Sequence, residues 1–171
     1  MRQSRTASLI LADADSTRRI GHAIGDALAL DSSAGAVIWL EGELGAGKTT
    51  LVAGVLGRLD APGPIRSPTY TLVEPYEAAG RMLYHIDLYR LVDPRELEAL
   101  AVRDMLSDHG ILLIEWPSRA HANLPPADLQ IEMHYEGSGG RRMQARALTE
   151  RGDKVLRAIV ATNSEKGGVS P

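Results

Sequence analysis

Apolar residues along the chain follow two patterns, which together predict an α/β protein. Ala36-Val37-Ile38-Trp39-Leu40 and Ile111-Leu112-Leu113-Ile114 are continuous apolar runs, as expected of parallel strands buried on both faces. Other apolar residues recur three and four positions apart, which predicts helices with one buried face. These helical sets lie between residues 20 and 28, 51 and 59, and 155 and 160.

A first antiparallel hairpin is predicted after the central helix. Residues 69–77 and 81–89 are strand-like, and Ala78-Ala79-Gly80 joins them. That connection suits a tight turn with glycine in the left-handed conformation. Residues 8–11 form a further apolar patch, which we interpret as an edge strand. The predicted sheet is therefore mixed.

A second hairpin is predicted near the end of the chain. Residues 129–135 alternate between apolar and polar, and Gly137-Ser138-Gly139-Gly140 supplies the turn. On the return strand Met143, Ala145 and Ala147 alternate as buried positions. Arg141, Arg142 and Arg146 on the same strand are expected to be solvated.

Polar residues mark where the predicted helices begin. Asp15 or Ser16 can cap the first helix, and Thr149 can cap the last. Asp93 is followed by Pro94 and by an acid three positions after the cap, which is a strong start signal. We expect each of these caps to satisfy backbone N–H groups that the first helical turn leaves unpaired.

The stretch Gly42-Glu43-Leu44-Gly45-Ala46-Gly47-Lys48-Thr49 matches the P-loop pattern G-x-x-x-x-G-K-S/T at every fixed position. It lies between a predicted strand and a predicted helix, the context in which this pattern binds phosphate. Glycines let successive backbone N–H groups point at phosphate oxygens, and Lys48 is expected to be exposed and to reach the β- and γ-phosphates. A glycine-rich turn is the alternative. The expected nucleotide-binding residues are Gly42, Gly45, Ala46, Gly47, Lys48, Thr49 and Thr50.

Two acidic residues are candidates for metal binding and catalysis. Glu115 ends the apolar run 111–114 in a Walker B pattern, and such strands deliver a carboxylate to the edge where α/β sheets bind ligands. With the Thr49 hydroxyl it is expected to hold Mg²⁺, which prefers oxygen ligands; a solvated glutamate is the alternative. Asp87 lies among apolar neighbours, so its carboxylate needs a partner. That partner is either an arginine such as Arg90 or the water shell of the metal.

Three further features are weaker candidates. Ser67-Pro68-Thr69 lies just past the P-loop helix, where nucleotide-sensing loops respond to the γ-phosphate and Mg²⁺. An ordinary Ser-Pro turn fits the same residues. Thr17 is a candidate contact to the base or sugar, or else only part of a helix start. His85 is interpreted as a structural histidine.

Composition narrows the class of protein. The chain has 171 residues, enough to bury about 70% of the unfolded surface in one domain. We expect that domain to span residues 1–162, with a polar, disordered tail over 163–171. The absence of cysteine excludes disulfides and thiolate chemistry. A net charge of −3 argues against a basic nucleic-acid-binding face, and no apolar run reaches the ~20 residues of a membrane span, so a cytoplasmic protein without membrane contact is expected.

Together with the P-loop, three stretches resemble the TsaE family, the small ATPase of the bacterial machinery that makes threonylcarbamoyladenosine (t6A) in tRNA. They are Ser67-Pro68-Thr69-Tyr70-Thr71-Leu72-Val73, His85-Ile86-Asp87-Leu88-Tyr89-Arg90 and Ile114-Glu115-Trp116-Pro117. The resemblance covers residues 15–146. It departs at Glu43, where Asp is frequent, and at Ser118, where an acid commonly follows Trp-Pro. The fold class expected is a single-domain P-loop NTPase of the α/β class, three-layered, with a mixed central sheet that includes antiparallel hairpins.

The resemblance also implies a function. Members bind ATP and Mg²⁺, hydrolyse slowly alone and work with TsaB and TsaD, so that hydrolysis drives or resets the transferase complex and tRNA is met only indirectly. Carried over by motif, Lys48 and the loop glycines bind phosphate, Thr49 and Glu115 bind Mg²⁺, Asp87 is catalytic, and Ser67 to Thr69 form the switch.

Other functions remain open from the residues alone. A small-molecule kinase would need arginines that converge on a second substrate, and the loop after the P-loop helix supplies only Arg66. A nucleotide-dependent scaffold without significant turnover is also compatible with the motifs. A GTPase is disfavoured, because no stretch resembles the guanine-reading Asn-Lys-x-Asp.

Overall fold

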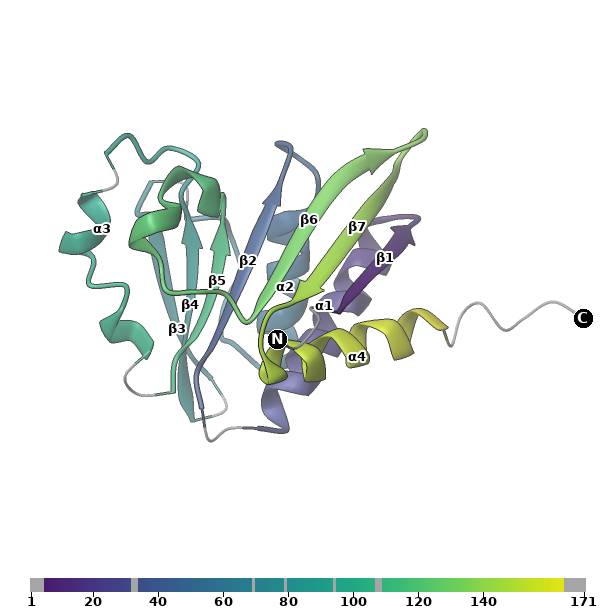
Figure 1. Cartoon of the computed structure of the whole chain (residues 1–171), viewed down its shortest axis with the longest axis horizontal. Helices are drawn as coiled ribbons and strands as arrows, with labels where there is room; N and C mark the ends of the chain where they lie inside the picture. Colours follow the sequence, from purple (N-terminus) through teal and green to yellow (C-terminus); the bar gives the residue numbers. More distant parts are fainter. Residues whose placement is uncertain are drawn as a thin grey trace, which may run out of the picture.

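The computed structural model describes residues 5–31, 34–68, 70–78, 80–93, 95–106 and 109–164. Within them the strands form one seven-stranded sheet in the order β1-β7-β6-β2-β5-β4-β3 (Figure 1). Their bounds are β1 (Thr6–Leu11), β2 (Ala36–Gly42), β3 (Val73–Ala78), β4 (Arg81–Asp87), β5 (Ile111–Glu115), β6 (Leu129–Glu136) and β7 (Gly140–Ala147).

The central strands β4, β5, β2 and β6 are parallel, whereas β3, β7 and β1 each pair antiparallel with a neighbour. This confirms the predicted mixed sheet with two hairpins and an edge strand at β1. The continuous apolar runs of β2 and β5 are buried throughout, because layers cover both faces of the sheet there.

The helices form the outer layers. The α1 helix (Ala14–Ala29) and the α2 helix (Lys48–Arg58) lie behind the sheet in Figure 1, and α4 (Glu150–Ser164) packs against α1 and β7. The other face, over β2, β5 and β4, carries α3 (Glu96–Ala99) and the 3-10 turns η1 (Asp104–Leu106), η2 (Pro117–Arg119) and η3 (His121–Asn123). The chain is therefore a single-domain, three-layer α/β protein with a P-loop NTPase-like fold, as predicted.

Helix caps were predicted with mixed success. The prediction for α1 is wrong: Asp13, not Asp15 or Ser16, is the cap, and its carboxylate accepts the Ser16 N–H at 2.7 Å. Asp13 has extended backbone and lies directly before the first helical residue, so its carboxylate reaches the first turn. Thr149 caps α4 as predicted, because its hydroxyl accepts the Gly152 N–H at 3.1 Å.

The predicted start of α3 is confirmed as a reciprocal cap. The Asp93 carboxylate accepts the Arg95 N–H at 3.0 Å, and the Asp93 N–H donates to the Glu96 carboxylate at 3.2 Å. Pro94 lies outside the described residues. At the other end of the chain α4 runs to Ser164, so the expected tail from Asn163 begins inside the helix, and residues 165–171 are not described.

The first hairpin starts later than predicted. β3 begins at Val73 because the segment before it closes a turn, in which the Leu72 N–H donates to the Pro68 carbonyl at 2.9 Å. Leu72 itself has a left-handed backbone with φ of 61°, which ends the extended pairing. Gly80 has φ of 71°, so the expected left-handed glycine in the hairpin turn is confirmed.

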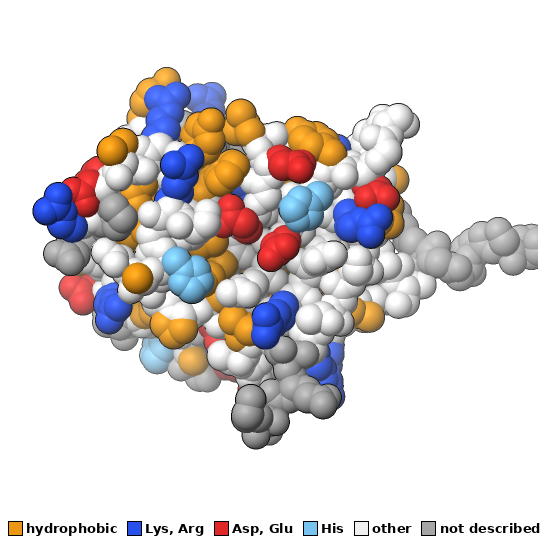
Figure 2. All heavy atoms as spheres, turned by 45° about the horizontal axis from the view of Figure 1, so that its top comes forward, with side chains coloured by type: hydrophobic (Ala, Val, Ile, Leu, Met, Phe, Trp, Pro, Cys, Tyr) orange, Lys and Arg blue, Asp and Glu red, His pale blue; other side chains and the backbone are white. Residues whose placement is uncertain are grey.

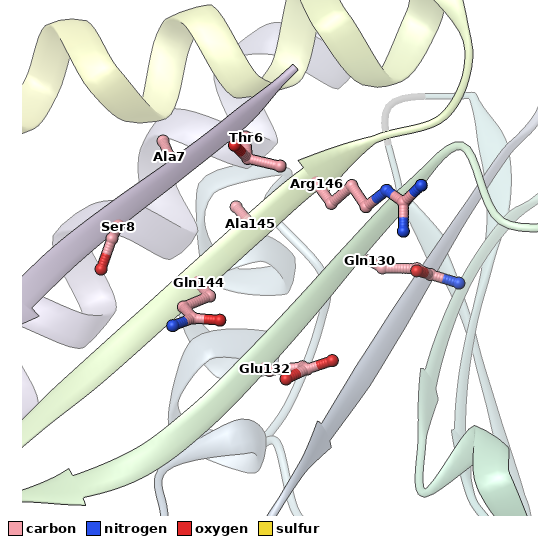
Figure 3. A pocket seen from close by; sticks show the side chains of 8 residues that line it. All are labelled: Thr6, Ala7, Ser8, Gln130, Glu132, Gln144, Ala145 and Arg146. Atoms are coloured by element: carbon pink, nitrogen blue, oxygen red, sulfur yellow. The ribbon is translucent and has the colours of Figure 1, made fainter. Parts of the chain in front are cut away.

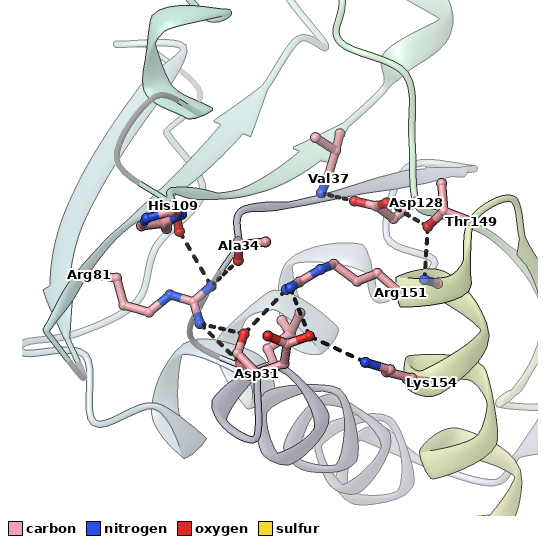
Figure 4. Close-up of polar contacts among 11 residues, drawn as sticks. Asp31, Ala34, Val37, Arg81, His109, Asp128, Thr149, Arg151 and Lys154 are labelled. Carbon is pink, nitrogen blue, oxygen red and sulfur yellow. Dashed lines mark hydrogen bonds and ion pairs between the residues drawn. The ribbon is translucent and has the colours of Figure 1, made fainter.

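A polar network closes the end of the sheet where the strands begin (Figure 4). The Arg81 guanidinium is buried and donates to backbone carbonyls from several segments, those of Leu28, Asp31, Ala34 and His109. The Asp31 carboxylate pairs in turn with Arg151 and Lys154 of α4. This network ties the C-terminal end of α1 to β4 and α4, opposite the P-loop.

None of the helices in the described part of the chain combines the length and hydropathy that crossing a bilayer requires.

Candidate nucleotide and metal site

The P-loop follows β2 and leads into α2 at the edge where the parallel strands end. Figure 2 shows this end of the molecule obliquely, and acidic, basic and apolar side chains are interspersed on the surface in view. Gly42, Gly45 and Gly47 all have positive φ, at 137°, 77° and 103°. A side chain at Gly42 would also meet the Met133 carbonyl oxygen at 2.0 Å. These positions therefore require glycine, and the loop presents the N-terminal end of α2 to a ligand.

Lys48 is buried, which contradicts the expected exposed loop lysine. The residue is 4% exposed, and Nζ donates to the carbonyls of Gly42 at 2.7 Å and Glu43 at 2.9 Å. Nζ also lies 4.1 Å from the centroid of the Trp116 ring. The sequence could not show this, because the ring that covers the lysine comes from the distant end of β5.

The charges around Lys48 are predominantly negative. Burial lowers the pKa of the Lys48 ammonium, and this effect is opposed by nearby carboxylates, first Glu115 and then Glu41, Asp87 and Glu43. Several carboxylates thus surround one ammonium. A cation bound together with a triphosphate would offset this negative charge.

Thr49 and Glu115 meet, as the sequence predicted. The Thr49 hydroxyl donates to Glu115 Oε1 at 2.9 Å. The same oxygen lies 2.8 Å from His85 Nε2. An ionised carboxylate only accepts hydrogen bonds, so in a contact with ionised Glu115 the Nε2 nitrogen is the donor. Nδ1 is buried and has no hydrogen-bond partner among the described residues.

Asp87 lies beside Glu115, because the two residues are register partners on β4 and β5. Its carboxylate accepts a hydrogen bond from the Ser67 hydroxyl and another from the Tyr89 N–H at 3.0 Å. Arg90, one suggested partner, instead places its guanidinium 4.7 Å from the Tyr70 ring centroid. The catalytic candidate and the switch segment are therefore in direct contact, a link that the sequence did not reveal.

Trp116 is a site residue that the sequence analysis did not single out. It follows Glu115 directly and has φ of 58°, a left-handed conformation that is unusual for so large a residue. The Trp116 N–H donates to the Leu40 carbonyl at 3.0 Å, and its ring packs 5.1 Å from that of Tyr89. This backbone turn brings the ring over Lys48.

The remaining predicted residues have modest roles in the structure. Thr17 is buried, its hydroxyl donates to the Asp13 carbonyl at 3.2 Å, and its methyl group faces Gly47. Thr50 is half-buried in the first turn of α2. Pro68 is buried and its carbonyl closes the turn to Leu72, whereas Thr69 lies outside the described residues.

Arg141 also contradicts its prediction. It is half-buried and donates to the P-loop carbonyls of Ala46 at 3.1 Å and Gly45 at 3.3 Å, whereas Arg142 and Arg146 are exposed as expected. The alternation along the strand could have predicted this partial burial. Arg141 lies two residues before buried Met143 and therefore on the same side of β7.

The described residues contain no group of three or more His, Asp or Glu side chains arranged to hold a metal ion by themselves. Thr49 and Glu115 nevertheless fit Mg²⁺, which commonly takes one or two protein oxygens and completes its shell with phosphate and water. Their contact at the start of α2 places a hydroxyl and a carboxylate where such an ion would meet bound phosphates.

Two hollows lie away from the P-loop. One of about 450 Å³ lies on the open face of β1, β7 and β6, and Figure 3 shows polar side chains of these strands around it. They include Ser8, Gln130, Glu132, Gln144 and Arg146. The other, about 270 Å³, lies beside the switch segment and is lined by Arg66, Ser67, Pro68 and Tyr70 among others. The P-loop lines neither hollow, so the candidate site rests on the motif geometry.

Comparisons with known proteins identify the family of the chain. The family model described as threonylcarbamoyl adenosine biosynthesis protein TsaE matches residues 11–143. A protein of Haemophilus influenzae named tRNA threonylcarbamoyladenosine biosynthesis protein TsaE is 42% identical over 77% of this chain and 83% of its own length. A Nostoc protein of the same name is 39% identical over 80% of this chain and 83% of its own.

The fold is also similar to a solved structure. The crystal structure of Bacillus subtilus YdiB has a TM-score of 0.73 and 24% sequence identity, over 94% of this chain and 98% of that one. Because the family model and the two relatives each match most of the sequence, the chain belongs to the TsaE family of tRNA threonylcarbamoyladenosine biosynthesis proteins.

Proposed function

We propose that this protein is a Mg²⁺-dependent, cytoplasmic ATPase of t6A biosynthesis, which binds ATP at its P-loop and hydrolyses it to drive or reset a complex of TsaB and TsaD. The observation that carries the proposal is the convergence of three elements. The P-loop threonine contacts Glu115 at the end of β5, and Asp87 stands beside Glu115 at the end of β4. A glycine-rich turn without a phosphate-binding role would not explain why these residues come together.

Phosphate binding follows from the loop and from Lys48. The positive φ values of the loop glycines and the N-terminal end of α2 provide backbone donors for phosphate oxygens. Lys48 uses two of its three N–H donors on the carbonyls of Gly42 and Glu43, which leaves a third donor for a phosphate oxygen.

Metal binding follows from Thr49 and Glu115. When bound, Mg²⁺ neutralises charge on the β- and γ-phosphates. His85 donates to the Glu115 oxygen that also receives the Thr49 hydroxyl, so the histidine fixes the direction of this carboxylate. His85 thus has a positioning role in addition to the structural role that the sequence analysis assigned to it.

Water activation falls to Asp87. Asp87 is 5% exposed, and its carboxylate is held by the Ser67 hydroxyl and the Tyr89 N–H. A carboxylate held in this way can orient the attacking water and accept its proton. Because Ser67 belongs to the switch segment, the position of that segment and the orientation of Asp87 change together. This link gives nucleotide state a route to a partner protein.

The decisive experiment is phosphate release from ATP by the full chain, alone and with the TsaB–TsaD pair. We expect slow release alone and faster release in the complex. Transfer of phosphate to small acceptors would support the kinase alternative. ATP-dependent assembly without release would support the scaffold.

Glu115→Gln tests the metal assignment within the same assay. The amide keeps the shape and can still accept from Thr49 and His85, but it removes the charge that attracts Mg²⁺. We expect Mg²⁺-dependent hydrolysis to fall at least about tenfold, while Mg²⁺-free nucleotide binding changes much less. Equal losses in both measurements would assign Glu115 to folding instead.

A further inference from the structure

We infer that Tyr135 and Arg141, on the β6–β7 hairpin, are positioning residues that hold the P-loop in its phosphate-binding shape. The inference rests on the proposed function, since it takes the P-loop as a phosphate site. The Tyr135 hydroxyl donates to the Leu44 carbonyl at 2.8 Å. Arg141 donates through Nε to the Ala46 carbonyl at 3.1 Å and through Nη2 to the Gly45 carbonyl at 3.3 Å. Outward-facing loop carbonyls thus find donors on one hairpin.

The direction of a loop carbonyl determines the direction of the next N–H. In a trans peptide unit the C=O and the following N–H point to opposite sides. Donors on the carbonyls of Leu44 and Ala46 therefore turn the N–H groups of Gly45 and Gly47 away from the hairpin, toward the interior of the loop. The Ala46 N–H is already engaged, because it donates to the Glu43 carbonyl at 3.1 Å.

The loop needs such external support. Gly45 and Gly47 have no side chain to restrict their backbone, and both have positive φ, so their peptide units could reorient at little steric cost. A Cβ at Gly45 would meet the Tyr135 hydroxyl at 2.6 Å, which shows how closely the hairpin approaches the loop. Backbone donors that are oriented before the ligand arrives bind phosphate more tightly, because less ordering accompanies binding.

Arg141 is itself held in place from the hairpin side. Its Nη1 donates to the carbonyls of Gly139 at 2.9 Å and Gly140 at 2.8 Å, and its guanidinium lies 4.4 Å from the Tyr135 ring centroid. One planar group therefore bridges the hairpin turn and the P-loop. A lysine offers a point charge and lacks this fork of donors, so it cannot replace the bridge.

The adjacent arginine provides a matched control. Arg142 lies on the same strand and donates to the Glu136 carboxylate at 2.8 Å through both Nε and Nη2, across the same hairpin. Among the described residues its hydrogen bonds stay within the hairpin and do not reach the P-loop. An effect of hairpin stability would appear in variants of both arginines, whereas an effect of loop positioning would appear only in variants of Arg141.

The experiment measures ATP affinity by calorimetry, and KM and kcat for phosphate release, on the full chain. We expect Arg141→Ala to weaken ATP binding about tenfold and to raise KM with little change in kcat. Arg141→Lys should recover only part of the affinity, and Tyr135→Phe should lose a few-fold, about the effect of one neutral hydrogen bond. Arg142→Ala should stay within about twofold of the wild type.

Several outcomes would overturn the inference. Wild-type affinity in Arg141→Ala, full affinity in Arg141→Lys, or equal losses in Arg141→Ala and Arg142→Ala would each do so. If Arg141→Ala does not fold, Arg141→Lys and Tyr135→Phe decide, and wild-type affinity in both would reject the positioning role. Failure of the wild-type chain to bind ATP would instead reject the proposed function, which keeps the two failures distinct.

Discussion

Lys48 combines a proposed role in phosphate binding with contacts that stabilise the fold. A P-loop lysine on an exposed loop could be removed without structural cost, but here its ammonium satisfies the carbonyls of Gly42 and Glu43 and lies against Trp116. Removing it takes the ammonium donor from two part-buried carbonyls and leaves a gap against the Trp116 ring, which we expect to cost free energy of folding in addition to any lost phosphate contact.

Lys48→Ala should therefore abolish tight ATP binding and also lower the free energy of unfolding by about 1–3 kcal/mol. Calorimetric ATP binding and urea unfolding on the same preparations measure the two effects. Lys154→Ala is the control, because the Lys154 side chain is largely exposed and pairs only with Asp31 among its described ion-pair partners. ATP affinity equal to the wild type in Lys48→Ala would contradict the phosphate-cradle assignment.

The role of Asp87 is best tested by a substitution that removes its charge but keeps its shape, because the side chain also makes two hydrogen bonds. Asp87→Asn retains an oxygen for the Tyr89 N–H, and the Ser67 hydroxyl can accept from the new amide. The fold and ATP binding should persist, while turnover falls by about a hundredfold or more, within the usual contribution of a general base. Single-turnover phosphate release separates chemistry from binding. Normal hydrolysis in this variant would remove Asp87 from the mechanism.

Among the elements, α1 and α2 pack closely where a glycine of each helix meets the backbone of the other. A Cβ at Gly54 would lie 2.5 Å from the Arg18 carbonyl oxygen, and one at Gly21 would lie 2.5 Å from that of Leu51. Glycine within a helix is less favourable than alanine by about 1 kcal/mol, so packing and not helix propensity explains these residues.

Gly54→Ala should consequently destabilise the protein, despite the better helix former, by about 1–3 kcal/mol of overpacking. Gly57→Ala is the matched control in the same helix, because a Cβ there meets nothing within 4 Å and should stabilise by up to about 1 kcal/mol. Midpoints of urea unfolding compare the two variants directly. A Gly54→Ala protein as stable as Gly57→Ala would show that the helices can separate without cost.

The elements also show how far the sequence could be interpreted. The strand, loop and helix around the P-loop were predictable, because apolar pattern and glycine positions act locally there. The segment before β3 was not, since its conformation depends on the left-handed Leu72 and on its bond to the Pro68 carbonyl. Thr49 and Glu115 could be brought together by the rule that parallel strands end at one edge. The burial of Lys48 depends on tertiary packing and has no counterpart in the pattern.

On the scale of the whole molecule, the two ends of the sheet differ in chemistry. One end holds carboxylates, the P-loop and Lys48, and the other holds Arg81 among backbone carbonyls. The open face of β6, β7 and β1 is a third, polar surface that belongs to neither end. It is polar because alternate residues of these strands point away from α1. Ligand chemistry and the anchoring of the sheet are thus spatially distinct.

The glycine contact between α1 and α2 limits the ways in which this molecule can signal its nucleotide state. The backbones of α1 and α2 lie close together at Gly21 and Gly54, and Asp31, just after α1, pairs with Arg151 and Lys154 of α4. We therefore expect the two helices to move together, and not to act as a lever that carries a change at the P-loop across the molecule. On the proposed function, we therefore expect a signal from a bound nucleotide to leave through the rim of the site, where Ser67 contacts Asp87, and a partner to detect it there.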